Sequence, residues 1–360
     1  MRRENSKQAQ NPEFNRLANQ RWFEIPLLSA DPKEPGDAHA EDSPPPELVY
    51  RFGAATGDAA LASFGAFASQ QRGLASGEST IQDAVAAGLP SLARSLQEVL
   101  AVPQIMKADA VDALPRDAWY PALALMVARK SGGSTQGFFL AVQASGNGRS
   151  HGHNDTGSFI VFVEGEPLFI DVGVEAYTAK TFSRERYTIW TMQSAYHNLP
   201  TIGGVMQHEG ASFHASSVQY RSTDAIASLS MDLAGAYPAE AGATRWTRTV
   251  SLDRERDTVT VSEDFALRKL QPVMLTFLTP RQPRISAPGA ITLQARRAGS
   301  SAVRLQFNSG QLTAKVEAIE LKDEGLSRTW GPTIYRVLLV SAAPVARGMW
   351  EIRMEKETSR

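Results

Sequence analysis

Apolar and polar residues alternate along most of the chain after Pro115, which is the period of a β-strand with one buried face. Leu123, Leu125 and Val127 alternate before a Gly132-Gly133 turn, and the run Phe138–Val142 follows, so a hairpin is predicted. Two more hairpins are predicted, one joining 159–163 to 168–170 around Glu164-Gly165-Glu166, the other joining 247–252 to 258–265 around 253–257. Further strands are expected at 273–278, 291–295, 303–307, 313–320 and 335–340.

These short strands, with tight turns and almost no helix between them, predict a mainly β fold in which antiparallel sheets pack as a β-sandwich. Before them, from Glu47 to about Leu100, the pattern is helical. Asp58 is a candidate N-cap for a helix over Ala59–Gln71. Ser91 precedes a second helix, in which one predicted apolar face is formed by Leu92, Leu96, Val99 and Leu100.

The chain has 360 residues, which favours more than one domain. We predict a polar, Pro-rich leader over 1–46, a short α-helical region over 47–112 and a β-sandwich domain over 113–360. The formal net charge of −1 provides no basic field, so no nucleic-acid partner is expected. The absence of cysteine excludes disulfides, thiolate nucleophiles and Cys-ligated metals. No apolar run has the length of a membrane span, and no apolar segment follows the charged N-terminus as in a signal peptide.

Candidate chemistry lies in the Gly-rich segment Ser150-His151-Gly152-His153-Asn154-Asp155, between two predicted strands. Residues two apart in an extended segment share a side, so both imidazoles can face one cavity. Asp171 ends the apolar run 168–170 and needs a partner if it is buried, and His197 lies further along. Two imidazoles and a carboxylate suit Zn²⁺, while a hydrogen-bonded polar loop is the alternative interpretation. His208 and His214 are expected to be solvated.

The stretch SHGHNDTGSFIVFVEGEPLFIDVGVEAYT, followed by FSRERYTIWTMQSAYHNLPTIGGVMQ, resembles the heparinase II/III-like polysaccharide lyases. The resemblance is strong over 114–207, and the helical stretch from Leu48 onward resembles the end of that family's helical domain. It implies an incomplete α/α toroid followed by an antiparallel β-sandwich, with the active site between them. No stretch within residues 1–110 matches the toroid's catalytic motifs.

The resemblance also implies roles for individual residues. A mainly structural zinc ion would be held by His153, Asp171 and His197, and His151 would face the substrate as a catalytic group. Tyr177 and Tyr187 are two candidates for a catalytic tyrosine, and for Tyr177 packing is an equally good interpretation. Arg149, Arg184 and Arg186 could attract a polyanion. For Arg184 and Arg186, a solvated charged turn is the alternative interpretation. Trp119 and Trp190 are interpreted as core residues rather than sugar-stacking platforms.

The function implied is a polysaccharide lyase that cleaves a uronic-acid-containing glycan by β-elimination, in a truncated form with impaired activity. The alternative is a non-catalytic carbohydrate-binding or structural β-sandwich with a bound zinc. A metal-dependent hydrolase is a third interpretation, for which Asp155 is the nearby candidate base. The partner expected is an acidic polysaccharide. The family resemblance implies a periplasmic or secreted location, whereas a genuine start at Met1 would imply a cytoplasmic one.

Overall fold

The computed structural model describes residues 46–71, 92–111, 114–149, 152–297 and 300–357, and the side chains of 71 and 92–98 are outside this description. The chain forms two compact units, whose boundary falls between Pro115 and Arg116. The predicted leader over 1–46 lies almost wholly outside the described residues. No helix in the described ranges is both long and apolar enough to cross a membrane.

The helical unit contains α3 (Pro46–Thr56), α4 (Ala59–Gln71) and α6 (Leu92–Ile105). The N-cap prediction is confirmed, because the Asp58 carboxylate accepts the Leu61 N–H at 3.0 Å. Gly53 and Gly65 lie where α3 and α4 cross. A Cβ at Gly53 would come within 2.3 Å of the Ala62 nitrogen, so this crossing requires glycine.

The predicted apolar face of α6 is wrong in its second half. Val99 and Leu100 are 57% and 72% exposed, whereas Ala101 and Ile105 are buried against Ala66 of α4. One residue rotates a helix face by about 100°. Tertiary packing therefore buries the adjacent i, i+4 pair Ala101 and Ile105 in place of Val99 and Leu100.

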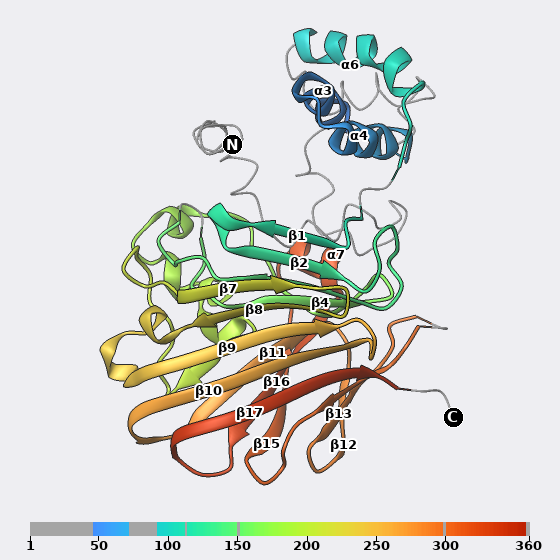
Figure 1. The fold of residues 1–360 in the computed structure, drawn as a ribbon. Helices are drawn as coiled ribbons and strands as arrows, with labels where there is room; N and C mark the ends of the chain where they lie inside the picture. The colour runs from blue at the N-terminus through green and yellow to red at the C-terminus, as the bar shows by residue number, and fades with distance from the viewer. Residues whose placement is uncertain (1–45, 72–91, 112–113, 150–151, 298–299, 358–360) are drawn as a thin grey trace. The chain divides into compact units, whose positions relative to one another are not determined.

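The β-unit contains three sheets, and the strand pairings in them are antiparallel. The five-stranded sheet contains, in order, β1 (Asp117–Tyr120), β2 (Leu125–Arg129), β3 (Phe138–Gln143), β4 (Phe159–Val163) and β5 (Glu166–Phe169). The eight-stranded sheet contains β12 (Pro283–Ala287), β13 (Ala290–Leu293), β14 (Val303–Gln306), β17 (Val345–Lys356), β10 (Thr258–Gln271), β9 (Ala243–Asp253), β8 (Ile226–Asp232) and β7 (Ser216–Ser222) (Figure 1). The four-stranded sheet contains β15 (Leu312–Glu320), β16 (Thr333–Ser341), β11 (Val273–Thr279) and β6 (Pro200–Ile202), and helix α7 (Glu324–Trp330) lies between β15 and β16 in sequence.

All three predicted hairpins are confirmed. Strand β2 pairs with β3, β4 with β5, and β9 with β10. The turn between β4 and β5 places Glu164 at φ 55° and Gly165 at φ 79°. Two consecutive positive φ values are typical of the tight turns whose twist matches that of the flanking strands.

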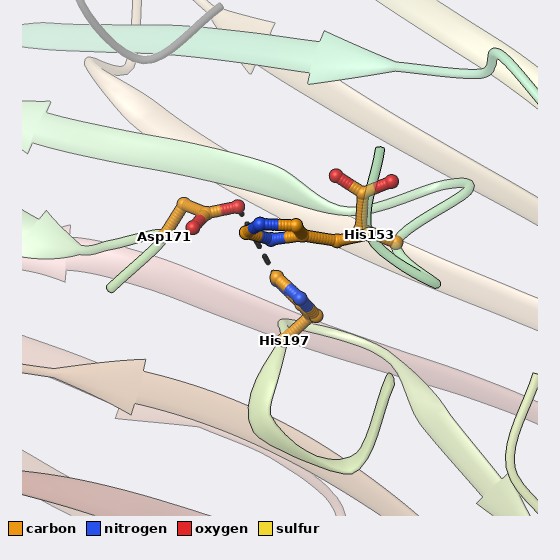
Figure 2. A group of neighbouring side chains, drawn as sticks. His153, Asp171 and His197 are labelled. Carbon is orange, nitrogen blue, oxygen red and sulfur yellow. Dashed lines mark ion pairs between the residues drawn. The ribbon is translucent and has the colours of Figure 1, made fainter. Parts of the chain in front are cut away.

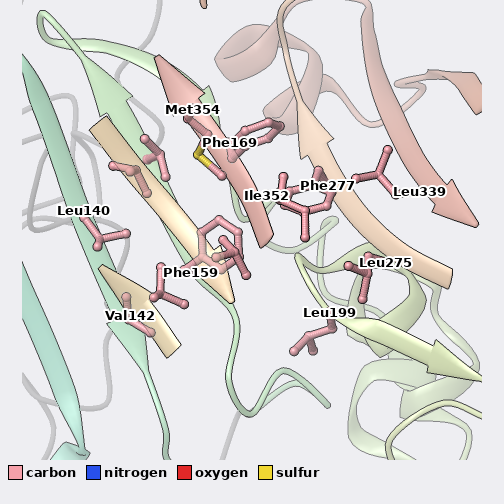
Figure 3. Packing of buried hydrophobic residues seen from close by; sticks show 14 of the residues in the cluster. Leu140, Val142, Phe159, Phe169, Leu199, Leu275, Phe277, Leu339, Ile352 and Met354 are labelled. Atoms are coloured by element: carbon pink, nitrogen blue, oxygen red, sulfur yellow. The ribbon is translucent and has the colours of Figure 1, made fainter. Parts of the chain in front are cut away.

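One hydrophobic core draws residues from all three sheets, which confirms the β-sandwich. Figure 3 shows Val142 of β3 and Phe159 of β4 on one side, and Ile352 and Met354 of β17 in the same cluster. Phe277 of β11 contacts Phe159 and Phe169, with ring centroids 6.1 and 5.3 Å apart. Directly after β5, the Ile170 N–H donates to the Leu278 carbonyl at 2.9 Å. The five-stranded and four-stranded sheets therefore meet edge to edge where β5 ends beside β11.

Candidate metal centre

Three polar side chains converge beside the β5–β11 junction (Figure 2). Asp171 follows the buried strand β5, and His197 follows the short 3₁₀ helix Ser194–Tyr196. His153 comes from the loop between β3 and β4. All three are buried, with exposed fractions of 2%, 0% and 8% respectively. The structure therefore brings together the three residues predicted as metal ligands.

The geometry of this group is tight. His197 Nδ1 lies 3.2 Å from Asp171 Oδ2, and the His153 and His197 rings are 5.3 Å apart between centroids. Asp155 joins them, and one potential ligand atom from each of the four residues lies within 4.8 Å of the others. The other Asp171 oxygen accepts the Gly173 N–H at 2.9 Å. That bond fixes the carboxylate's orientation, as backbone donors commonly do for ligating carboxylates.

Burial and charge set the protonation states. Burial lowers the pKa of His153 to about 4, so its imidazole is neutral at pH 7 and can donate a lone pair. Burial alone would raise the pKa of Asp171, but His197 and His153 lower it to about 2. Burial alone would lower the pKa of His197, but the Asp171 carboxylate raises it above its usual value. Asp171 is therefore ionised.

The four residues fit a metal ion. Although His197 lies close to Asp171, neither of its ring nitrogens makes a hydrogen bond of normal geometry within the described structure, and Asp155 Oδ1 makes none either. Unsatisfied buried polar atoms are costly, and a bound cation would satisfy Asp155 Oδ1 and one of the two His197 nitrogens, since an ion coordinates an imidazole through a single nitrogen. With bonds near 2.0–2.2 Å, tetrahedral ligands lie about 3.4 Å apart, close to the His197–Asp171 separation of 3.2 Å. Two nitrogens and two carboxylates would occupy all four positions of such a site.

Asp155 is the candidate ligand that sequence reasoning missed, having considered it only as a base. Its signal was present, because Asp155 follows His153 by two residues, the spacing that places side chains on one side of an extended segment. Arg149 lies beside it, with Nη2 3.7 Å from Asp155 Oδ1 and 3.2 Å from Gln143 Oε1. Arg149 lies on the same β3–β4 loop as His153 and Asp155, which we call the metal loop, and contacts Asp155 within it.

Asn198 and Arg248 hold the junction together. The Asn198 amide donates to the carbonyls of Phe159 at 2.7 Å and Ile170 at 3.2 Å, and its Oδ1 accepts the Leu278 N–H at 2.6 Å. It therefore ties β4, the end of β5 and β11 together, next to His197 in sequence. Arg248 Nη1 donates to the carbonyls of Gly157 at 2.9 Å and Asn198 at 2.7 Å. Its charge is neutralised by Glu263, which accepts from Arg248 Nε at 2.9 Å.

A second network shapes the loop that carries His153. Asn147 Oδ1 accepts the backbone N–H groups of Asp155 and Thr156, each at 3.2 Å, and its Nδ2 donates to Gln207 Oε1 at 3.0 Å. Gln207 in turn donates to the Thr156 carbonyl at 2.7 Å. These buried amides position the two ligands of the loop without being ligands themselves. Neither Asn147 nor Gln207 was predicted, because isolated amides have no sequence signature.

The remaining predicted site residues are placed differently from one another. His151 lies outside the described residues. Tyr177 is 45% exposed and packs edge-on against the exposed ring of Phe182, at 5.5 Å. Tyr187 is half-buried, and burial raises the pKa of its phenol above the usual range. Arg184 is exposed, whereas Arg186 donates to the carbonyls of Gly152 at 3.4 Å and Thr181 at 3.1 Å. Arg186 therefore docks against the chain next to His153.

The two tryptophans also differ. Trp119 is partly buried, packs against the core and stacks on Tyr220 at 5.0 Å. Trp190 is half-buried but lines a surface pocket, so its interpretation as a core residue does not describe its full environment. His208 and His214 are exposed, as expected.

The fold is similar to those of solved polysaccharide lyase structures. The structure is similar to heparan sulfate lyase HepC from Pedobacter heparinus, with a TM-score of 0.56 and 13% identity over 74% of this chain and 41% of that chain. It is also similar to a heparinase III gene product, with a TM-score of 0.54 and 16% identity over 72% of this chain and 40% of that one. The chain thus spans about two fifths of the length of these proteins. A search of curated protein sequences found no match.

The sequence itself carries the family signature. Residues 113–330 match the family described as Heparinase II/III-like, C-terminal. This range includes Asp171, the strand β5 that it follows, and both histidines of the buried cluster. The chain therefore belongs to the heparinase II/III-like family and contains its C-terminal β-sandwich domain.

Proposed function

We propose that this protein is a polysaccharide lyase that cleaves a uronic-acid-containing glycan by β-elimination. The observation that carries the proposal is the buried cluster of His153, Asp171 and His197, found within a domain of the heparinase II/III-like family. Two solved structures that resemble this chain are described as a heparan sulfate lyase and a heparinase III. The substrate class proposed is accordingly an acidic polysaccharide.

We further propose that the metal is Zn²⁺ and that its role is mainly structural. Two imidazoles with carboxylates are a donor set that zinc accepts. With Asp155 as a fourth ligand, the site would have no open position for a substrate. Bound zinc would stabilise the fold and fix the loop that carries His153. The hydrolase alternative is disfavoured, because an Asp155 that binds the metal is not available as a base.

The elimination needs a base, an acid and a group that stabilises negative charge. The base removes the proton from C5 of the uronate, the electron pair forms the C4–C5 double bond, and the C4–oxygen bond breaks. The acid then protonates the departing oxygen. We assign these two proton transfers to His151 and to one of the two tyrosines Tyr177 and Tyr187, since imidazole and phenol suit either task.

Stabilisation of the carboxylate would come from an arginine, because charge builds up there as C5 loses its proton. Arg184 is exposed and so available to a polyanion, whereas Arg149 and Arg186 contact residues of the metal loop, Asp155 and Gly152 respectively. We therefore propose that Arg184 attracts the glycan. For Arg149 and Arg186, we propose that they orient the loop next to His151, with any contact to the substrate made from that position.

The test is ultraviolet absorbance during incubation with heparan sulfate, heparin and alginate, because elimination creates an absorbing unsaturated uronate. The proposal expects product on at least one glycan and a loss of about 10²–10⁴-fold in rate for His151→Ala, the usual contribution of general acid–base catalysis. His214→Ala, which removes an exposed histidine, is the matched control. Glycan binding without product would refute the lyase and support the carbohydrate-binding alternative.

We propose a periplasmic or secreted location, which matches a substrate outside the cytoplasm. Cell fractionation with an antibody to the chain tests this. Recovery only with cytoplasmic markers would contradict it.

A further inference from the structure

A pocket opens beside the metal centre and uses residues to which the proposed mechanism gives no role. Its volume is about 280 Å³, and it is built from the segment that follows β5 and from the 3₁₀ helices before His197. Its lining includes Glu175, Thr178, Lys180, Trp190 and Met192. We call this the Trp190 pocket.

The aromatic wall of the pocket is held in place. Trp190 Nε1 donates to Glu175 Oε1 at 2.8 Å, which fixes both side chains. The Trp190 ring also packs edge-on against Tyr196, with centroids 5.2 Å apart. The Arg336 guanidinium lies over the Tyr196 ring at 4.5 Å. A wall fixed in this way is ready for a ligand without further ordering, which reduces the entropy cost of binding.

The polar groups of the pocket suit a hydroxylated, anionic ligand. Glu175 uses one oxygen for Trp190, and its other oxygen can accept a hydroxyl proton. Lys180 is exposed and, within the described part of the chain, makes no ion pair. An unpaired ammonium at the edge of a pocket favours a carboxylate or a sulfate through a charge-assisted hydrogen bond.

A backbone hydrogen bond connects the pocket to the loop that carries His153. Met192 is buried at its base, and the Met192 carbonyl accepts the Asn154 N–H at 3.0 Å, next to His153. Tyr177 lies in sequence between two residues that line the pocket, Ala176 and Thr178. A ligand held there would contact the backbone segment that carries a proposed catalytic tyrosine.

We propose that the Trp190 pocket binds one pyranose unit of an acidic glycan. The indole offers an apolar and amphipathic surface to the ring, Glu175 accepts from its hydroxyls, and Lys180 binds its carboxylate or sulfate. The volume, just below the range of roughly 300–1,000 Å³ for drug-sized ligands, fits one sugar unit. The assignment of an acidic glycan rests on the proposed function, whereas the pocket's preference for an anion rests on Lys180.

The experiment is calorimetric titration with tetrasaccharides of heparan sulfate and of alginate, and with neutral cellotetraose. It uses the full chain carrying His151→Ala, so that turnover does not interfere. Lys180→Gln should raise the Kd of an acidic tetrasaccharide about tenfold. Trp190→Phe keeps an aromatic ring but removes the donor to Glu175, and should also weaken binding. Lys315→Gln, which makes the same change of charge on exposed β15, is the control.

The outcomes separate this proposal from the lyase proposal. Weaker binding of the acidic tetrasaccharide by both pocket variants, but not by Lys315→Gln, supports the pocket, whether or not the parent chain eliminates. Equal Kd values for the parent, Lys180→Gln and Trp190→Phe overturn it, even if the chain is an active lyase. Equal affinity for cellotetraose and the acidic glycans overturns the anionic ligand class.

Discussion

The substitution Glu263→Gln should destabilise the β-unit strongly and loosen the metal centre. Glu263 and Arg248 are both almost fully buried, with side-chain exposures of 0% and 1%. Glutamine has the same shape as glutamate and can still accept from Trp246 Nε1, which donates to Glu263 at 2.7 Å. The substitution therefore removes the negative charge and also turns an amide N–H donor toward the Arg248 N–H groups, from which Glu263 Oε1 accepts. It leaves the Arg248 guanidinium buried with no counter-charge among its described contacts.

The magnitude follows from that uncompensated charge. Breaking a buried ion pair by removing one partner costs about 3–5 kcal/mol. For a unit of this size, each kcal/mol shifts Tm by roughly 2–4 °C, so the expected loss is about 6–20 °C. Because Arg248 holds the carbonyls of Gly157 and Asn198, which flank the metal loop and His197, metal affinity should fall as well.

Urea and thermal unfolding, followed by circular dichroism, measure the first effect, and competition with a chromophoric zinc chelator measures the second. Glu351→Gln is the control, because Glu351 forms an exposed pair with Arg353 on β17, at 3.3 Å, with 60% and 45% side-chain exposure. Such pairs contribute about 0–1 kcal/mol. If Glu263→Gln costs no more than Glu351→Gln, Arg248 does not depend on Glu263 and the reasoning is refuted.

Three further predictions concern the metal centre and the response to pH. A chelator should lower Tm by about 8–16 °C if the free zinc concentration before chelation is 1,000 times the Kd, which corresponds to about 4 kcal/mol of stabilisation. The chelator should leave the Tm of His197→Ala unchanged, and an equal fall in that variant would contradict the site. Asp155→Asn should weaken zinc binding and change the visible spectrum of the cobalt-substituted protein, because it replaces an anionic ligand; an unchanged spectrum and affinity would remove Asp155 from the ligand set. Burial alone would raise the pKa of Asp257, but Lys356, the Phe138 N–H and Lys130 lower this pKa. Asp257 therefore stabilises the fold at pH values above the pKa of an unfolded aspartate, about 3.9. This stabilisation is lost as pH falls below that value. Asp257→Asn should therefore be less stable than the parent at pH 7, and the difference should shrink as pH falls below about 3.9, as measured by urea unfolding; a constant difference at all pH values would contradict the assignment.

Sequence reasoning found some strands of the β-unit and missed others. β9 and β10 were predicted because their alternating pattern is bounded by a polar turn, and both pair as expected. β8 and β17 were missed, although Leu229 and Met231 of β8 and Ile352 and Met354 of β17 alternate and are buried. The three-residue β6 has no such pattern. It exists because β11 supplies its hydrogen-bonding partner.

The helical unit shows the limit of periodicity. The Asp58 N-cap was predictable, because a cap depends on a few neighbouring residues. The buried face of α6 was not, because an apolar stripe that includes Val99 and Leu100 does not say which of its edges meets another helix. That choice depends on the shape of the neighbouring surface.

The sequence by itself determined the β-sandwich and the spacing of the loop that carries His153 and Asp155, since alternation and two-residue spacing are local properties of an extended chain. Only the tertiary structure decided that Asp171 and His197 meet that loop. They converge because β5 ends beside β11, where Asn198 ties the strands together through bonds to Phe159, Ile170 and Leu278. The Trp190 pocket likewise exists only in three dimensions. Contacts between residues distant in sequence follow from packing and long-range hydrogen bonds, and no local pattern records them.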